Sequence, residues 1–270
     1  MLEINNLHVA FNRGSLNQVC ALRGVTLVVG EGSFVTIIGT NGSGKSTLLN
    51  AIAGPLFPDA GCITLDGKNI TAWPEHKRAR LIGRVFQNPF TGTAPAMTIE
   101  ENLALAAKRG ERRGLGWALK PGLRSLFRTR VSGLKLGLED RLGAEIGTLS
   151  GGQRQALTLL MASWKKPRLL LLDEHTAALD PKSAEQIVRM TREIVARERM
   201  TTIMITHSMH QAVSLGERLV MMHRGAIAYD VSGAEKRRLR ASDLLGRFEE
   251  LRRMDQLDLA AAEMLRETYV

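Results

Sequence analysis

Cysteine, aromatic residues and long apolar runs are all scarce in this sequence. Its two cysteines, Cys20 and Cys62, lie beside no second cysteine and no histidine cluster, which excludes a disulfide framework and a zinc site built on them. Aromatic residues make up only 4%, so Leu, Ile, Val, Met and Ala must build the core. The strongest apolar run, 169–172, suits one strand and is far short of the roughly 18 residues that span a bilayer. The N-terminal residues show no basic segment followed by an apolar one, so we expect no secretory signal.

Acidic residues are fewer than basic residues in this sequence. The sequence has 37 Lys and Arg residues and 27 Asp and Glu residues, which gives a formal net charge of +10 at pH 7. This net charge favours an anionic partner such as a nucleotide, a nucleic acid or an acidic lipid surface. Between residues 108 and 135 nine Lys and Arg stand against one acid, Glu111, so this segment alone carries +8. Two interpretations stay open for it: a patch that faces lipid headgroups, or a solvated helix face.

Apolar runs and helical patterns alternate along the first and last thirds of the chain. Strands are predicted at 2–11, 25–29, 34–38, 62–65, 169–172, 202–205 and 218–222, and helices at 45–53, 152–163 and 181–199. This alternation predicts an α/β fold with a largely parallel sheet and helices on both faces. The basic middle, where a helix is expected to start near Thr98, is typical of an inserted helical subdomain.

The segment Gly-Thr-Asn-Gly-Ser-Gly-Lys-Ser at 39–46 matches the phosphate-binding pattern G-x-x-x-x-G-K-[ST]. Its glycines let backbone N–H groups turn toward one anion, and the following helix adds its positive end. We expect Lys45 to reach the β and γ phosphates and the Ser46 hydroxyl to bind Mg²⁺. The predicted nucleotide-binding residues here are Gly39, Thr40, Asn41, Gly42, Ser43, Gly44, Lys45, Ser46 and Thr47. A dinucleotide site is excluded because Thr47 stands where a third glycine is needed.

A second acidic motif follows the buried run at 169–172, where Asp173 and Glu174 come next in the sequence. Since side chains alternate along a strand, we expect the two carboxylates to point different ways. One can then hold Mg²⁺ while the other faces the attacking water. Together with the phosphate loop, this motif predicts hydrolysis of a nucleotide.

The sequence Leu-Ser-Gly-Gly-Gln at 149–153, shortly before that motif, resembles the signature of ATP-binding-cassette (ABC) transporter nucleotide-binding subunits. Further segments resemble the family's motifs: Val-Phe-Gln at 85–87, Thr-Ala-Ala-Leu-Asp at 176–180 and Ile-Thr-His at 205–207. The resemblance implies a P-loop NTPase (RecA-like) core with an N-terminal antiparallel β subdomain and an inserted α-helical signature subdomain. It also implies an ABC ATPase domain at 1–240, with the insertion at about 88–152, and a C-terminal helical tail at 241–270.

The resemblance also implies a role for each matching residue. Glu174 is the expected general base, His207 contacts the γ-phosphate, and Gln87 approaches Mg²⁺ and the water. The implied catalytic residues are thus Glu174, His207, Lys45 and Gln87. The implied metal ligands are Ser46, Gln87 and Asp173. Phe11 is expected under the adenine, although a lone aromatic at a strand end is as often a core residue. A second copy of the chain would contribute Ser150, Gly151, Gly152, Gln153 and Asp180 to the same ATP.

Two departures from the common family pattern point to a sub-group. The loop after Glu174 begins His175-Thr-Ala177, where the family usually has Pro-Thr-Ser, and the loss of the serine hydroxyl removes one possible hydrogen bond across the dimer. The helix after the signature also lacks its usual arginine. Both departures resemble bacterial importer ATPases that accompany lipoprotein-like solute-binding proteins and permeases of the branched-chain amino-acid type, some of them assigned to aromatic amino acids.

The expected function is therefore ATP hydrolysis, with ATP and Mg²⁺ as cofactors, that drives solute import. The expected partners are a second copy of the chain in an ATP-sandwich homodimer, an integral-membrane permease and, indirectly, a solute-binding protein, on the cytoplasmic face of the membrane. Two alternatives stay open: an exporter ATPase, and a soluble ABC-type ATPase acting on nucleic acid or ribosomes. No nucleic acid is expected, because the zinc modules, long coiled coils and second cassette usual in the latter class are not visible in the sequence.

Overall fold

The computed structural model of the chain describes residues 1–111 and 122–254. An antiparallel sheet with the order β2-β1-β4-β5 holds the N-terminal strands. Its members are β1 (Leu2–Phe11), β2 (Val19–Val29), β4 (Ala60–Leu65) and β5 (Lys68–Asn69). Buried and exposed residues alternate along much of β1 and β2, because only one face of this sheet covers the core.

The second sheet is largely parallel and has the order β10-β9-β3-β8-β7-β6. Its strands are β3 (Phe34–Gly39), β6 (Ile82–Val85), β7 (Leu169–Asp173), β8 (Thr202–Ile205), β9 (Arg218–His223) and β10 (Ala226–Ser232). Every residue of β3 and β8 is buried, as expected for parallel strands that are covered on both faces. Only β10 runs antiparallel to its neighbour, β9.

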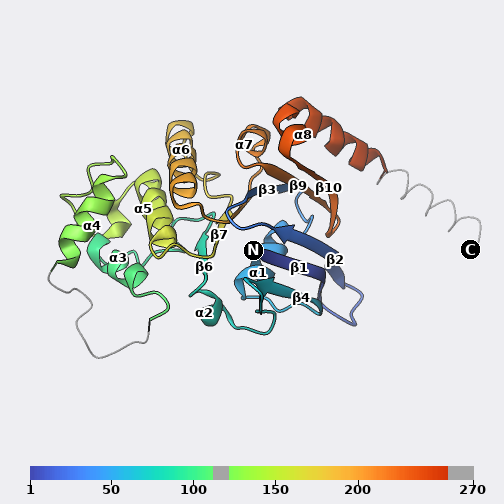
Figure 1. The fold of residues 1–270 in the computed structure, drawn as a ribbon, viewed down its shortest axis with the longest axis horizontal. Coiled ribbons are helices and arrows are strands. Elements are labelled where there is room, and N and C mark those ends of the chain that lie inside the picture. The colour runs from blue at the N-terminus through green and yellow to red at the C-terminus, as the bar shows by residue number, and fades with distance from the viewer. Residues whose placement is uncertain (112–121, 255–270) are drawn as a thin grey trace, which may run out of the picture.

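The labelled α-helices of the described residues are α1 (Lys45–Ala53), α2 (Glu75–Arg78), α3 (Ile99–Ala107), α4 (Leu123–Ser132), α5 (Gly151–Ser163), α6 (Pro181–Glu198), α7 (Met209–Ser214) and α8 (Gly233–Arg238). Figure 1 shows α3, α4 and α5 together at one end of the molecule, away from β1, β2 and β4. An edge-to-face contact between Phe127 and Trp164 lies in the core of this helical part. The α/β fold class, with its antiparallel β subdomain and helical insertion, is confirmed.

The predicted domain limits stay predictions. Residues 241–254 of the expected tail are helical, and 255–270 lie outside the described residues.

In the described part of the basic segment at 108–135, several cations are paired with acids or backbone carbonyls. Arg109 is half-buried and donates a 2.8 Å hydrogen bond to the Ala162 carbonyl of α5. Arg124 pairs with a carboxylate of α3 at 3.0 Å, and Arg128 pairs with another acid. Both interpretations of the segment, lipid-facing patch or solvated face, stay predictions, and residues 112–121 of the segment lie outside the described residues.

Arg78 ties the helix that follows the phosphate loop to the segment after β5. It is fully buried and donates to the carbonyls of Ala51 and Ile52 in the last turn of α1, and to those of Thr71 and Trp73. Burial lowers the pKa of its guanidinium to about 10. One side chain therefore satisfies carbonyls that the end of a helix leaves without partners inside the helix.

Replacing Arg78 with Met should lower the free energy of unfolding by at least about 3 kcal/mol, since several buried carbonyls lose their donor at once. Urea unfolding followed by circular dichroism measures the change. The matched control is Arg124→Met, which removes an exposed ion pair and should cost less than about 1 kcal/mol. Equal losses in both variants would contradict a structural role for Arg78.

Candidate nucleotide site

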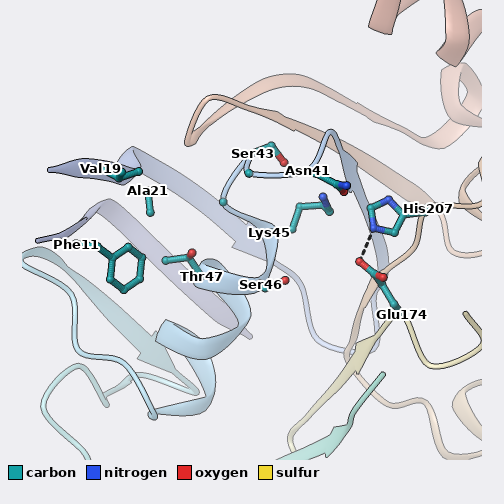
Figure 2. Close-up of a pocket in the computed structure, with 12 residues that line it drawn as sticks. Phe11, Val19, Ala21, Asn41, Ser43, Lys45, Ser46, Thr47, Glu174 and His207 are labelled. Atoms are coloured by element: carbon teal, nitrogen blue, oxygen red, sulfur yellow. Dashed lines mark ion pairs between the residues drawn. The ribbon is translucent and has the colours of Figure 1, made fainter. Parts of the chain in front are cut away.

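A cavity of about 400 Å³ opens between the phosphate loop, the first two strands and the ends of β7 and β8. Figure 2 shows Phe11 at one side of this cavity and Lys45, Glu174 and His207 at the other. Its lining consists of Phe11, Val19, Ala21, Asn41, Gly42, Ser43, Gly44, Lys45, Ser46, Thr47, Glu174 and His207. The structure thus brings most of the phosphate-loop residues together with the predicted base and the predicted histidine.

The phosphate loop has a backbone that only glycine adopts without strain. Gly42 and Gly44 have φ angles of +77° and +100°. A Cβ atom on Gly44 would lie 2.5 Å from the Ala21 carbonyl oxygen, so a side chain is excluded there. No side chain caps the N-terminus of α1, which leaves its first N–H groups for an anion. The Ser43 hydroxyl is buried without a hydrogen-bond partner, a second polar group that a phosphate can satisfy.

Lys45 lies at the base of this loop. Its ammonium donates to the carbonyls of Gly39 and Thr40 at 2.9 Å each. Burial lowers the pKa of Lys45, while the negative charges of Glu174 and Asp173 act in the opposite direction. The side chain is thus held in the cavity, close enough to two carboxylates for their charges to affect it.

Glu174 and His207 contact one another across the ends of neighbouring strands, with Nε2 of the histidine 2.6 Å from Oε1 of the glutamate. Strand β7 ends at Asp173, and Glu174 has a φ of +45°. The two acids have different partners, Arg84 for Asp173 and His207 for Glu174, but Glu174 lies beyond the strand, so a left-handed backbone and not strand alternation sets its direction. Such a conformation is costly for a residue with a side chain and is concentrated at functional sites.

Asp173 has a partner that the sequence analysis missed. Arg84 on β6 pairs with it at 3.1 Å, and the same guanidinium lies over the Phe86 ring, 4.6 Å from its centre. The parallel pairing of β6 with β7 brings these residues together, although 89 positions separate Arg84 from Asp173 in the chain. No local sequence motif predicts such a contact.

The donors for Mg²⁺ fit the preference of this ion for oxygen. Among the residues that the structure describes, no group of three acids, histidines or cysteines could enclose a metal. Mg²⁺ is commonly held by one or two carboxylates and the phosphates of the substrate. Ser46 lines the cavity, whereas Asp173 does not and pairs with Arg84, so the predicted roles of both as metal ligands stay predictions. Gln87 is exposed on the bend after β6 and does not line the cavity, so its predicted metal and catalytic roles stay predictions.

Phe11 is not a core residue. Its side chain is 41% exposed and lines the cavity beside Val19, which is 57% exposed. These two residues are paired across β1 and β2. Together with Ala21 they form an apolar end of the cavity that suits a planar base. Val19 and Ala21 were missed, and only the pairing of their strand with β1 could have shown them.

The signature lies outside this cavity. Ser150 and Gln153 form a capping box at the start of α5, each side chain 3.2 Å from a backbone N–H of the other residue. Ser150, Gly152 and Gln153 line a separate cavity of about 160 Å³. Asp180 caps α6 through a 3.0 Å bond from the Ser183 N–H, and hydrogen bonds from the side chain and the backbone of Ser183 lower the pKa of Asp180. A single chain therefore does not bring the signature and the phosphate loop together.

His175, one of the departures from the family pattern, is buried next to Glu174. Its Nε2 lies 3.0 Å from the Thr191 hydroxyl of α6, and burial lowers the pKa of the imidazole from 6.5 to about 4. The histidine is therefore neutral at physiological pH and attaches the loop after β7 to α6.

The buried imidazole should make the fold sensitive to acid. Between pH 6.5 and 4 the unfolded chain binds a proton at His175 that the folded chain does not. The free energy of unfolding therefore decreases by up to about 1.4 kcal/mol for each pH unit by which the pH is lowered. From pH 7 to pH 5 the wild type should lose about 2 kcal/mol more than His175→Gln. Urea unfolding at both pH values measures this. His210→Gln, an exposed change, serves as the control, and parallel losses in wild type and His175→Gln would contradict the prediction.

Comparisons with known proteins show which family the chain resembles over most of its length. The sequence profile of the ABC transporter family matches residues 22–177. A tyrosine transport ATP-binding protein of Clostridioides difficile is 42% identical over 249 residues, which cover 92% of this chain and 99% of the relative. A lipoprotein-releasing system ATP-binding protein of Caulobacter vibrioides is 33% identical and covers 82% of this chain and 92% of its own length.

Solved structures show the same architecture. A dimeric ATP-binding cassette in a post-hydrolysis state, bound to ADP and Pi, superimposes with a TM-score of 0.72 at 28% identity, covering 86% of this chain and 98% of the cassette. An ABC transporter cassette in its ADP conformation gives a TM-score of 0.73 at 29% identity, covering 87% of this chain and 92% of the cassette.

The phosphate loop, the acid pair and the fold define an ATP-hydrolysing P-loop protein. The chain belongs to the ABC transporter family, in which it is an ATP-binding subunit and an ATPase. None of the helices in residues 1–111 and 122–254 is long and apolar enough to cross a membrane.

Proposed function

We propose that this chain powers the import of an aromatic amino acid, with tyrosine as the first candidate. The observation that carries the proposal is the 42% identity to a tyrosine transport ATP-binding protein, which extends over nearly the whole of both chains. The His175 and Ala177 departures and the missing arginine after the signature, noted in the sequence, agree with the same sub-group. We infer that the chain acts at the cytoplasmic face of the membrane with a permease of the branched-chain type and a lipoprotein-like solute-binding protein.

We assign a separate role in ATP binding or hydrolysis to each group of residues in the site. The N–H groups of the phosphate loop and Lys45 bind the β and γ phosphates, and Phe11 with Val19 holds the base. Ser46 and Asp173 hold Mg²⁺, which neutralises charge on the phosphates when it is bound. Glu174 accepts the proton of the attacking water, and His207 fixes both the glutamate and the γ-phosphate. Such catalysis consists mainly of positioning and charge stabilisation.

A homodimer completes this site. In one chain, Ser150 and Gly152 are exposed or half-buried at the start of a helix and lie outside the cavity of the phosphate loop. A helix N-terminus is an anion site, so a second copy that faces the first supplies it to the γ-phosphate. Gln87, exposed beside the helical insertion, is available to the permease.

The experiment is uptake into vesicles that hold this chain together with a candidate permease of the branched-chain type and a candidate lipoprotein-like solute-binding protein. Vesicles loaded with ATP should accumulate labelled tyrosine, and unlabelled phenylalanine should compete more strongly than leucine. The Glu174→Gln assembly is the control and should not accumulate the label. Uptake of leucine but not tyrosine would reject the substrate, and ATP-driven loss of label from preloaded vesicles would reject import.

A further inference from the structure

Behind the Glu174–His207 pair, one side chain connects the two loops that carry these residues. Gln211 on α7 donates from Nε2 to the Thr176 hydroxyl at 3.1 Å. Its Oε1 accepts a 2.9 Å bond from the Thr206 hydroxyl. Thr176 is two residues after Glu174 in the sequence, and Thr206 immediately precedes His207. The amide of Gln211 therefore spans the gap between the loop of the base and the loop of the histidine.

The hydroxyls that Gln211 connects are shielded from water. Thr176 is 9% exposed and Thr206 is 3% exposed, so both need partners within the protein. The Thr206 hydroxyl also accepts a 3.1 Å bond from the Ser208 N–H, on the other side of His207. The backbone on both sides of the histidine is thereby held from one point, which makes its position depend on Gln211.

Gln211 itself is held on an anchored helix. The Ser208 hydroxyl caps α7 by accepting a bond from the Gln211 N–H at 3.3 Å. At the other end, buried Lys236 of α8 donates to the carbonyls of Val213 and Gly216 at 3.0 and 2.8 Å. Arg192 of α6 adds a 2.7 Å bond to the Ser214 carbonyl. Figure 1 shows α7 between α6 and α8. The helix is therefore a fixed support from which Gln211 can position other groups.

We propose that Gln211 is a positioning residue for hydrolysis, because it sets the separation and orientation of Glu174 and His207 through Thr176 and Thr206. This inference rests on the roles proposed for Glu174 and His207. Gln211 does not line the nucleotide cavity, so it acts on the chemical step and not on ATP affinity. The constraint matters because Glu174 has a strained backbone, with a φ of +45°, that only its surroundings can maintain.

The test compares variants of the full-length chain by steady-state ATP hydrolysis. Gln211→Leu keeps the size of the side chain but cannot bond to either hydroxyl. Its kcat should fall between about tenfold and a hundredfold while KM for ATP stays within about twofold, since misplacement affects the chemistry and not binding. Gln211→Glu should recover most of the loss, because a carboxylate can accept a bond from both threonine hydroxyls.

Two controls separate positioning from simple loss of structure. His210→Leu changes the exposed neighbour on the same helix and should leave kcat unchanged. Thr176→Val should lower kcat alone but add little to Gln211→Leu, because both changes break the same connection. A wild-type kcat in Gln211→Leu would overturn the proposal. The proposal would also be overturned if the kcat of Gln211→Leu decreased only in proportion to a decrease in melting temperature and Gln211→Glu did not restore it.

The same series tests the underlying assignment separately. Glu174→Gln must abolish turnover if this residue is the base. If Glu174→Gln remains active, the base is misassigned and the proposal for Gln211 fails with it. If Glu174→Gln is inactive and Gln211→Leu is fully active, only the positioning role fails.

Discussion

The Glu174→Gln variant should hydrolyse ATP at least about a hundredfold more slowly than the wild type while still binding it. The substitution keeps the shape of the side chain and can keep a hydrogen bond to His207, which lies 2.6 Å from the carboxylate in the wild type. An amide cannot accept the proton of the attacking water, so only the chemical step is removed. Because ATP then persists in the site, closed dimers should accumulate.

Single-turnover hydrolysis and gel filtration with ATP and Mg²⁺ measure these two effects. The matched control is Glu185→Gln, a change of the same chemistry on α6, which does not line the nucleotide cavity. Glu185→Gln should leave turnover and the elution volume as in the wild type. Near-normal hydrolysis by Glu174→Gln would remove this residue from the role of base.

A mixture of two inactive chains should regain activity if two copies share each site. Lys45→Ala loses phosphate contacts, and Ser150→Arg places a bulky charge where the facing γ-phosphate must approach. Each variant alone has two damaged sites per dimer. A mixed dimer has one doubly damaged site and one intact site, so an equal mixture should reach about a quarter of wild-type activity when the copies pair at random.

Colorimetric phosphate release against the mixing ratio measures this recovery. A mixture of Lys45→Ala with wild type is the control, because its mixed dimers also hold one intact site and show whether that site works alone. Active control dimers together with an inactive Lys45→Ala and Ser150→Arg mixture would reject shared sites.

Much of the fold could be predicted because its signals are local. The helix at Lys45–Ala53 starts after a glycine-rich loop and ends before a glycine, and both limits agree with the structure. Strands β3, β7 and β8 are short apolar runs and were found for that reason. By contrast, only one residue of β10 is fully buried and the strand carries no clear apolar pattern, and α4 lies within the basic segment, so neither element was predicted with its bounds.

The site was predictable as far as its motifs are continuous in sequence. The phosphate loop and the residues after β7 lie where their patterns indicated, whereas Val19 and Arg84 enter the site through strand pairing. Cations held by backbone carbonyls are the hardest case. Arg78 and Arg109 look like surface charges in the sequence, yet each is held by carbonyls from distant segments. Only tertiary structure creates these acceptors.

The capping box at the start of α5 has a consequence for how ATP joins two subunits. Ser150 and Gln153 fix the first turn of this helix within a single chain, and Arg154 holds the segment before it by donating to the carbonyls of Ile146, Gly147 and Leu149. The anion-binding surface therefore exists before a partner or a nucleotide arrives. Association then loses little conformational entropy at this loop, so more of the free energy of ATP binding is left to hold the two subunits together and to move whatever is attached to them.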